Sequence, residues 1–308
     1  MILSAGTKVV SKVAIAGTTH AYPAGVLAVI VEAPHDASHA YRVRLSDGFE
    51  THLCRDQFVL LRTLQASSIG RERAALEDRE LSEHVIYRCV VGSRAYGLDT
   101  EDSDVDTRGV YLPPARRQWS LYGVPEQLEN RQTDEVYWEL QKFLVLALKA
   151  NPNILEVLYS PIVLHVAPVA QELLSLRSAF LSKLIFQTYN GYVMSQFRRM
   201  TGRRERQLEP KWKHAMHLIR LLLSGITALR DGVIPVRVDD AHHERLMTIR
   251  RGEASFEEID EWRLELHRRF EDAYCVTQLP DRPDYEAANA FLIHARRSAL
   301  QDAPDNAP

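Results

Sequence analysis

The sequence has little cysteine and lacks long apolar runs. It contains three cysteines (Cys54, Cys89 and Cys275), too few and too widely spaced for a disulfide framework or a cysteine zinc site. This usage fits a reducing compartment, and we expect a cytoplasmic protein. No segment reaches the run of about 18 apolar residues that a membrane span requires, and residues 1–20 lack the apolar core of a signal peptide. We therefore expect no membrane partner.

An excess of positive charge is also absent. The 38 lysines and arginines are outnumbered by 41 aspartates and glutamates, and the formal net charge is −3. A protein that coats nucleic acid through a global basic field is excluded, so any contact with a polyanion must use a local patch. Hydrophobic residues make up 45% of the chain and charged residues 26%, which is an ordinary globular composition.

Strand-forming and helix-forming segments occupy separate regions. Short β-branched segments fill residues 1–64, with a hairpin signal at Ser46-Asp47-Gly48. Residues 85–153 alternate strand, turn, strand, strand and helix, an α/β pattern, and apolar residues recur at helical spacing from about residue 165. The predicted fold class is therefore α/β with accessory parts. We predict a small SH3-like β-barrel over 1–64, a linker helix over 65–84, an α/β core over 85–165, a helical bundle over 166–298 and a flexible tail over 299–308.

The most informative segment follows the predicted strand at 85–91. Gly92 and Ser93 open a glycine-containing turn, and Asp104 and Asp106 lie downstream, separated by one residue. Residues i and i+2 of a strand point to the same face, so both carboxylates should project together. Such a pair repels unless a cation lies between the two groups, and it suits Mg²⁺, with Mn²⁺ as an alternative ion. The glycines would let backbone N–H groups approach a polyphosphate closely.

A two-metal arrangement needs a third acidic side chain. Asp134, at the start of the strand that leads into a helix, is the candidate, and Glu135 is the alternative because a shift of one residue exchanges the two faces of a strand. Other motifs fail specific checks. An EF-hand loop starting at Asp102 would need glycine and glutamate where Thr107 and Pro113 stand. A P-loop is excluded because no Gly-Lys-Ser/Thr sequence follows the turn.

The spacing of these residues resembles a known signature. Gly92-Ser93, a ten-residue spacer and Asp104-Val105-Asp106 resemble the motif of the DNA polymerase β-type nucleotidyltransferase superfamily. The segments GSRAYGLDTEDSDVDTRGVYLPP, DEVYWELQKFL and ANPNILEVLYSP resemble a bacterial and phage group of predicted nucleotidyltransferases. The resemblance is strongest over residues 85–165, and KWKHAMHLIRLLLSG resembles the helical part of that group more loosely.

This resemblance implies an α+β nucleotidyltransferase core that moves a nucleoside monophosphate from an NTP, ATP by default, to an acceptor and releases pyrophosphate. It implies that Asp104 and Asp106 are metal ligands, that Asp134 is the third carboxylate, and that Gly92 and Ser93 bind the triphosphate. It does not name the acceptor. An RNA end, a small molecule and a protein hydroxyl all stay open, as does a homo-oligomer. The alternative is a catalytically silent module that binds nucleotide or RNA.

Further polar residues are candidates for contacts with phosphate. Arg94 is either a phosphate clamp or a solvent-facing residue. Lys213 and His217 share a helix face with Arg220, and this face forms either a cationic wall for phosphate or a solvated surface. Glu156 interrupts an apolar run, so it is either an orienting residue or a member of a structural ion pair. A basic cluster could contact an RNA backbone or form an exposed loop; it comprises Arg198, Arg199, Arg203, Arg204 and Arg206.

Overall fold

The structure of the protein is a computed structural model with two compact units, Met1–Glu77 and Asp78–Pro308. It describes residues 3–17, 21–34, 36, 39–61, 81–101, 103–121, 123–130, 132–205 and 211–301, without the side chains of 203–205 and 301. Most of the predicted linker helix over 65–84 and most of the predicted tail over 299–308 therefore lie outside the described residues.

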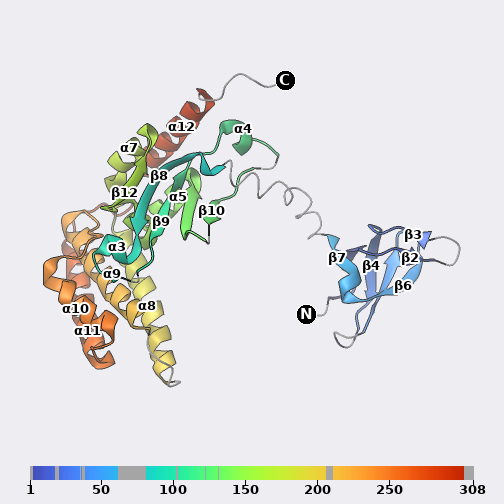
Figure 1. Ribbon diagram of the computed structural model, residues 1–308, viewed down its shortest axis with the longest axis horizontal. Coiled ribbons are helices and arrows are strands. Elements are labelled where there is room, and N and C mark those ends of the chain that lie inside the picture. Colours follow the sequence, from blue (N-terminus) through green and yellow to red (C-terminus); the bar gives the residue numbers. More distant parts are fainter. Residues whose placement is uncertain are drawn as a thin grey trace. The chain divides into compact units, whose positions relative to one another are not determined.

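The N-terminal unit contains an open sheet of five strands in the order β6-β5-β4-β1-β7 (Figure 1). Alternation of apolar and polar residues builds this sheet: in β5, Tyr41, Val43 and Leu45 are buried, and the arginines between them are exposed. The strands of this unit are β1 (Lys8–Ser11), β2 (Ile15–Ala16), β3 (Ala21–Tyr22), β4 (Leu27–Glu32), β5 (Tyr41–Leu45), β6 (Glu50–Leu53) and β7 (Phe58–Leu60).

The predicted N-terminal barrel is not supported. Strands β6 and β7 lie at the two edges of the sheet, and no pairing between them closes it among the residues that the structure describes. Within the described ranges, strands β2 and β3 pair with each other and with no other strand. Alternating segments and turn residues specify hairpins, but closure depends on strand tilt and stagger, which those local patterns do not encode.

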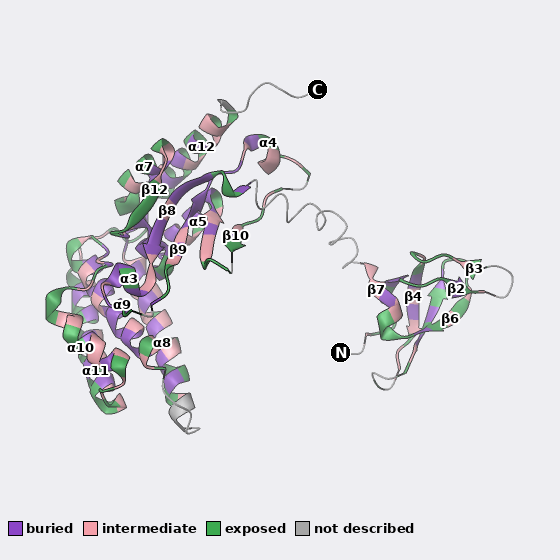
Figure 2. Ribbon diagram, in the orientation of Figure 1, coloured by how far each residue is buried: buried purple, intermediate pink, exposed green. Residues whose placement is uncertain are grey.

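The larger unit is built on a second sheet, in the order β10-β11-β9-β8-β12 (Figure 1). The predicted strand over 85–91 is confirmed as β8, which is largely buried near the middle of the unit (Figure 2). Strands β9 and β11 are parallel, and the other neighbours are antiparallel. The strands are β8 (Val85–Val91), β9 (Asp106–Tyr111), β10 (Gln127–Asn130), β11 (Glu135–Glu139) and β12 (Val163–Val166).

The helices of this unit form two groups around the sheet. Helices α8 to α11 pack together near α3, with α9 in contact with the other three, whereas α12 contacts α4, α5 and α7 (Figure 1). The helices are α3 (Gly92–Tyr96), α4 (Ala115–Gln118), α5 (Leu140–Leu148), α6 (Pro152–Leu158), α7 (Pro168–Ser175), α8 (Leu184–Glu205), α9 (Trp212–Asp231), α10 (Asp240–Arg251), α11 (Phe256–Val276) and α12 (Tyr285–Gln301). Within the described ranges, no helix has the length and apolar character to cross a membrane.

Local sequence signals account for the ends of the helices near α9. Asp239 accepts a hydrogen bond from a backbone N–H at the start of α10, and Ser255 forms a capping box with Glu258 at the start of α11. Gly232 and Gly252 end α9 and α10 in the left-handed conformation, which glycine adopts without steric cost. Gly232 thus determines where α9 ends, and the other caps determine both ends of α10 and the start of α11.

Candidate active site

A cavity of about 520 Å³ lies between α3 and the first turns of α9. Strand β8 ends at Val91, which pairs with Asp106, the first residue of β9, and the chain turns at once into α3. This register places the turn at Gly92 and Ser93 beside Asp106. The cavity is lined by Gly92, Ser93, Tyr96, Asp106, Lys211, Trp212, Lys213, His214, Met216 and His217.

Glycine is required at position 92 for two reasons. Its φ is +71°, a left-handed conformation that L side chains rarely adopt. A Cβ atom there would also lie 2.5 Å from Oδ2 of Asp106. The absence of a side chain therefore lets the turn and the carboxylate approach each other, and the buried Ser93 follows on the cavity wall.

Replacement of Gly92 by alanine should impair both stability and site geometry. The left-handed backbone costs a non-glycine residue about 1–2 kcal/mol, and the displaced Asp106 carboxylate should lower any turnover by about 100-fold. Urea unfolding and a turnover assay measure the two effects. Gly191→Ala is the matched control, because Gly191 is helical with nothing near its Cβ position. Equal behaviour of the two variants would contradict this assignment.

Asp106 and Asp134 lie opposite each other at the start of the neighbouring strands β9 and β11. Because Glu135 pairs with Thr107 in the parallel register, the preceding residues, Asp134 and Asp106, are opposite each other. Their carboxyl groups are close enough to share a hydrogen bond. Burial and this hydrogen bond raise the pKa of Asp106, whereas the same bond, assisted by Arg108, lowers the pKa of Asp134. The fold therefore opposes ionisation of Asp106 and favours ionisation of Asp134.

Arg108 holds this acidic pair together. Its guanidinium donates to the backbone oxygen of Asp134 at 2.6 Å and to its carboxylate at 3.1 Å, and it lies 3.7 Å from the Asp106 carboxylate. Arg108 thus supplies positive charge between the two acids. Arg108 was not among the predicted site residues, although its i, i+2 relation to Asp106 on one strand face is visible in the sequence.

Asp104 and Arg94 do not line the cavity. Asp104 is exposed and precedes the first residue of β9. Arg94 donates two hydrogen bonds to the backbone oxygen of Ser103, at 2.8 and 3.3 Å, and Arg250 of α10 donates to the Ser103 hydroxyl at 3.0 Å. These bonds hold the loop before Asp104 against α3 and α10. The roles of Asp104 as a metal ligand and Arg94 as a phosphate clamp stay predictions.

The two facing carboxylates fit a divalent metal ion. Mg²⁺ is normally held by one or two carboxylates together with phosphate oxygens, and Asp106 and Asp134 are such a donor set. A bound ion would take over the charge compensation that Arg108 provides. In the described part of the chain, however, no group of three or more His, Cys, Asp and Glu side chains is placed to hold a metal. The three-carboxylate arrangement expected from the sequence is thus not assembled there.

The α9 wall of the cavity carries positive charge. Lys211 and Lys213 line it, the charge of Lys213 acts to lower the pKa of Asp106, and the start of a 20-residue helix adds partial positive charge. Burial and the neighbouring Arg220 lower the pKa of His217 to about 4, so His217 is neutral at pH 7. The lysines, rather than His217, therefore form the cationic part of this wall.

The partly buried His217 predicts a pH-dependent stability. Unfolded histidine binds a proton near pH 6.5, whereas folded His217 does so only near pH 4, so protonation of the unfolded chain opposes folding between these values. The free energy of unfolding should fall by about 2 kcal/mol from pH 7 to pH 5. Urea unfolding of the wild type and of His217→Asn measures this contribution. The charged and titratable neighbours, Arg220, Glu156 and His214, are unchanged in that variant, so identical pH slopes would contradict the assignment.

Arg220 forms a buried ion pair with Glu156 of α6 beneath the cavity. The second carboxylate oxygen of Glu156 accepts a hydrogen bond from the Tyr96 hydroxyl at 2.7 Å, and the Arg220 guanidinium lies 3.6 Å from the centre of the Tyr96 ring. Burial is the largest single influence and would raise the pKa of Glu156, but the attraction of Arg220 and the other favourable contacts of the carboxylate together lower that pKa. The ion pair expected for Glu156 is confirmed, and it joins α3, α6 and α9.

The cavity thus gathers residues predicted from three separate stretches of sequence. Gly92, Ser93, Asp106, Lys213 and His217 line it together, and Asp134 contacts Asp106. Arg220, expected on the same helix face, is buried instead, so the solvated alternative for that face is wrong at this position. In the basic cluster, α8 continues through residues 203 and 204, so those arginines do not form a loop, and Arg206 lies outside the described residues.

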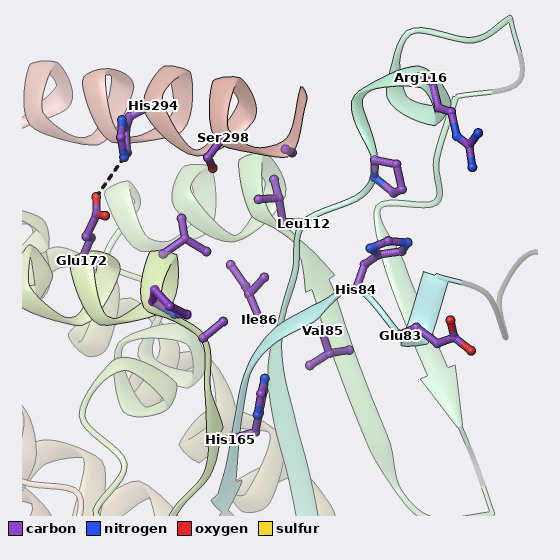
Figure 3. A pocket seen from close by; sticks show the side chains of 15 residues that line it. Glu83, His84, Val85, Ile86, Leu112, Arg116, His165, Glu172, His294 and Ser298 are labelled. Carbon is purple, nitrogen blue, oxygen red and sulfur yellow. Dashed lines mark ion pairs between the residues drawn. The ribbon is translucent and has the colours of Figure 1, made fainter. Parts of the chain in front are cut away.

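A second cavity of about 560 Å³ lies at the opposite end of β8 (Figure 3). Ile86 and Leu112 project into its apolar interior, and His294 of α12 pairs with Glu172 of α7 at 3.3 Å on one side (Figure 3). None of the residues predicted to bind nucleotide or metal lines this cavity. The candidate chemistry therefore belongs to the cavity beside α9.

Comparison with known families places this chain among polymerase β-type, nucleotidyltransferase-like proteins. The model of the family described as "RNA repair pathway DNA polymerase beta family" (RlaP) matches residues 67–294, which is 228 of the 308 residues. The chain therefore belongs to this family. The match includes the sheet, α3 and α9, so both walls of the cavity lie within it.

A curated relative is similar over a shorter stretch. The protein called "Uncharacterized protein YcgL" from Bacillus subtilis (strain 168) is 37% identical over 98 residues, which cover 30% of this chain and 38% of the relative. The match therefore spans well under half of that protein. Its name states no activity, so it supports kinship alone.

Proposed function

We propose that this protein is a Mg²⁺-dependent nucleotidyltransferase that moves a nucleoside monophosphate from an NTP, ATP by default, to an acceptor hydroxyl. The observation that carries the proposal is the single cavity that brings the Gly92–Ser93 turn, Asp106 and Lys213 together. Family membership supports a polymerase β-like nucleotidyltransferase role. A glycine turn, an acidic strand and lysines are the groups that binding of a metal-triphosphate requires.

The residues of the cavity divide the task of binding a triphosphate. Phosphoryl transfer depends mainly on positioning and on neutralising charge. The Ser93 hydroxyl donates a hydrogen bond to a phosphate oxygen, and Lys213 compensates phosphate charge from the opposite wall. Asp106 and Asp134 hold Mg²⁺, with Asp104 as the further ligand expected from the sequence. When bound, the ion offsets negative charge on the α-phosphate and on the departing pyrophosphate.

The acceptor is proposed to be an RNA end. The support is the family's description, which names an RNA repair pathway. The acceptor hydroxyl forms a bond to the α-phosphorus as the bond to the pyrophosphate oxygen breaks, and the hydroxyl proton is released. A small molecule and a protein hydroxyl are the other acceptors that a test must include.

A transfer assay tests this proposal. The full chain is incubated with each α-labelled NTP, Mg²⁺ and, separately, total RNA, a protein extract and a metabolite extract, and both label transfer and pyrophosphate are measured. The proposal expects pyrophosphate release and label in the RNA fraction that depend on Mg²⁺. Label in the protein or metabolite fraction instead would show that the acceptor is not RNA. The absence of pyrophosphate with every acceptor would contradict the enzyme assignment.

The alternative is a catalytically silent module that binds nucleotide or RNA. It is favoured by the position of Asp104 outside the cavity lining and by the contact of Arg108 with Asp134, because both leave fewer carboxylates in the cavity available to metal ions. This alternative predicts nucleotide binding that does not require Mg²⁺ and no pyrophosphate release. The same assay, combined with calorimetric titration of ATP with and without Mg²⁺, separates the two functions.

A further inference from the structure

Trp212 is an aromatic residue in the cavity that the proposed chemistry does not use. It is the first residue of α9, it is half-buried, and it lines the cavity while packing against the main core. The indole edge lies against α10: a Cβ atom on Gly252 would be 2.8 Å from Nε1 of Trp212. Gly252 therefore makes room for the indole and helps to fix its position.

The spacing of residues along α9 places two different rows side by side on the cavity wall. Lys213 and His217 are four residues apart and form a polar row, and this row faces the acidic strand because Lys213 acts on Asp106. Trp212 and Met216, also four residues apart, form the adjacent apolar row. A ligand whose charged part lies along the polar row would place an attached apolar or aromatic part on the neighbouring one.

We propose that Trp212 is the stacking platform for the nucleobase of the bound NTP. This inference rests on the proposed function, because it assumes that the triphosphate lies near Lys213. Stacking on an aromatic side chain accepts every base, since each has a π-face, and modest preferences follow stacking strength. The larger ring system of a purine buries more apolar surface than that of a pyrimidine. The site should therefore prefer purine nucleotides.

Equilibrium binding tests this role without requiring turnover. Affinities of the full chain for the α,β-methylene analogues of ATP and CTP are measured by calorimetry with Mg²⁺. Trp212→Leu, which keeps an apolar side chain but removes the ring, should weaken binding of the ATP analogue by about 5- to 150-fold, the range expected for one base–aromatic stack. The ratio of purine to pyrimidine affinity should fall to about one, and Trp212→Phe should restore most of both. Trp119→Ala is the matched control, because Trp119 is exposed and outside the cavity lining.

The outcomes separate a stacking residue from a structural one. Unchanged affinity in Trp212→Leu would overturn the inference. An equal loss of affinity for both analogues that Trp212→Phe does not restore would also overturn it, because such a loss indicates damage to α9 rather than loss of a contact with the base. If binding of neither analogue depended on Trp212 while NTP transfer persisted, this inference alone would be wrong. Binding that depends on Trp212 without transfer to any acceptor would instead overturn the proposed function, and no binding by the wild type would overturn both.

Discussion

Asp106→Asn is expected to reduce nucleotidyl transfer by about 10³-fold or more, because it removes from the centre of the site a charge that we propose binds the metal ion. The fold should survive. Burial and the hydrogen bond with Asp134 raise the pKa of Asp106, so the folded site favours the neutral acid, and an uncharged amide relieves a repulsion at pH 7. The melting temperature without nucleotide should therefore be equal to or higher than that of the wild type. Initial rates and thermal unfolding provide the two measurements.

Two other aspartates in the same loop make this experiment specific. Asp99→Asn is the matched control, since Asp99 is exposed and lies outside the cavity lining, and it should retain wild-type turnover. Asp104→Asn decides between two and three metal-binding carboxylates: a loss similar to that of Asp106→Asn supports three, and full activity supports two. Full activity in Asp106→Asn would refute the site itself.

Removal of either member of the buried Glu156–Arg220 pair should produce the largest loss of stability. Arg220→Ala would leave the Glu156 carboxylate buried without its cation, and such single removals typically cost about 3–5 kcal/mol. Because the pair joins α3, α6 and α9, the Gly92–Ser93 turn should also lose its position relative to Lys213. Chemical denaturation measures the free energy of unfolding of Arg220→Ala and Glu156→Ala.

A double variant and a surface ion pair test whether an unpaired buried charge causes this loss of stability. Glu156→Leu combined with Arg220→Met removes both charges, so it should be more stable than either single alanine variant. Arg251→Ala breaks exposed ion pairs with Glu244 and Glu253 and should cost less than about 1 kcal/mol. If Arg220→Ala cost no more than Arg251→Ala, the buried pair would not have the structural role assigned to it.

The parts of the site that were predictable are those that local sequence determines. The apolar strand over 85–91 and the glycine that follows specify a strand and a tight turn within a few residues of each other. Asp106 then pairs with Val91 through an antiparallel connection, which brings the second half of the motif to the same place. The i, i+4 spacing of Lys213 and His217 predicted a shared helix face, and the structure turns that face toward the glycine turn.

The remaining features depend on contacts between distant segments. Glu156 and Arg220 are 64 residues apart, and only the packing of α6 on α9 makes them partners. Arg220 was grouped with Lys213 and His217 because helical spacing identifies a face but not how deeply it is buried. The open N-terminal sheet differs from the predicted barrel for a similar reason: hairpin signals determine neighbouring strands, whereas closure depends on strands at opposite edges.

The central claim is that one cavity, between α3 and the start of α9, binds an NTP together with a divalent ion. A crystal structure of the full chain with Mg²⁺ and the α,β-methylene analogue of ATP tests it most directly. We expect the triphosphate between Ser93 and Lys213, with the ion bound to Asp106 and Asp134. Nucleotide bound in the cavity at the opposite end of β8, or an ion with no contact to Asp106, would contradict the account.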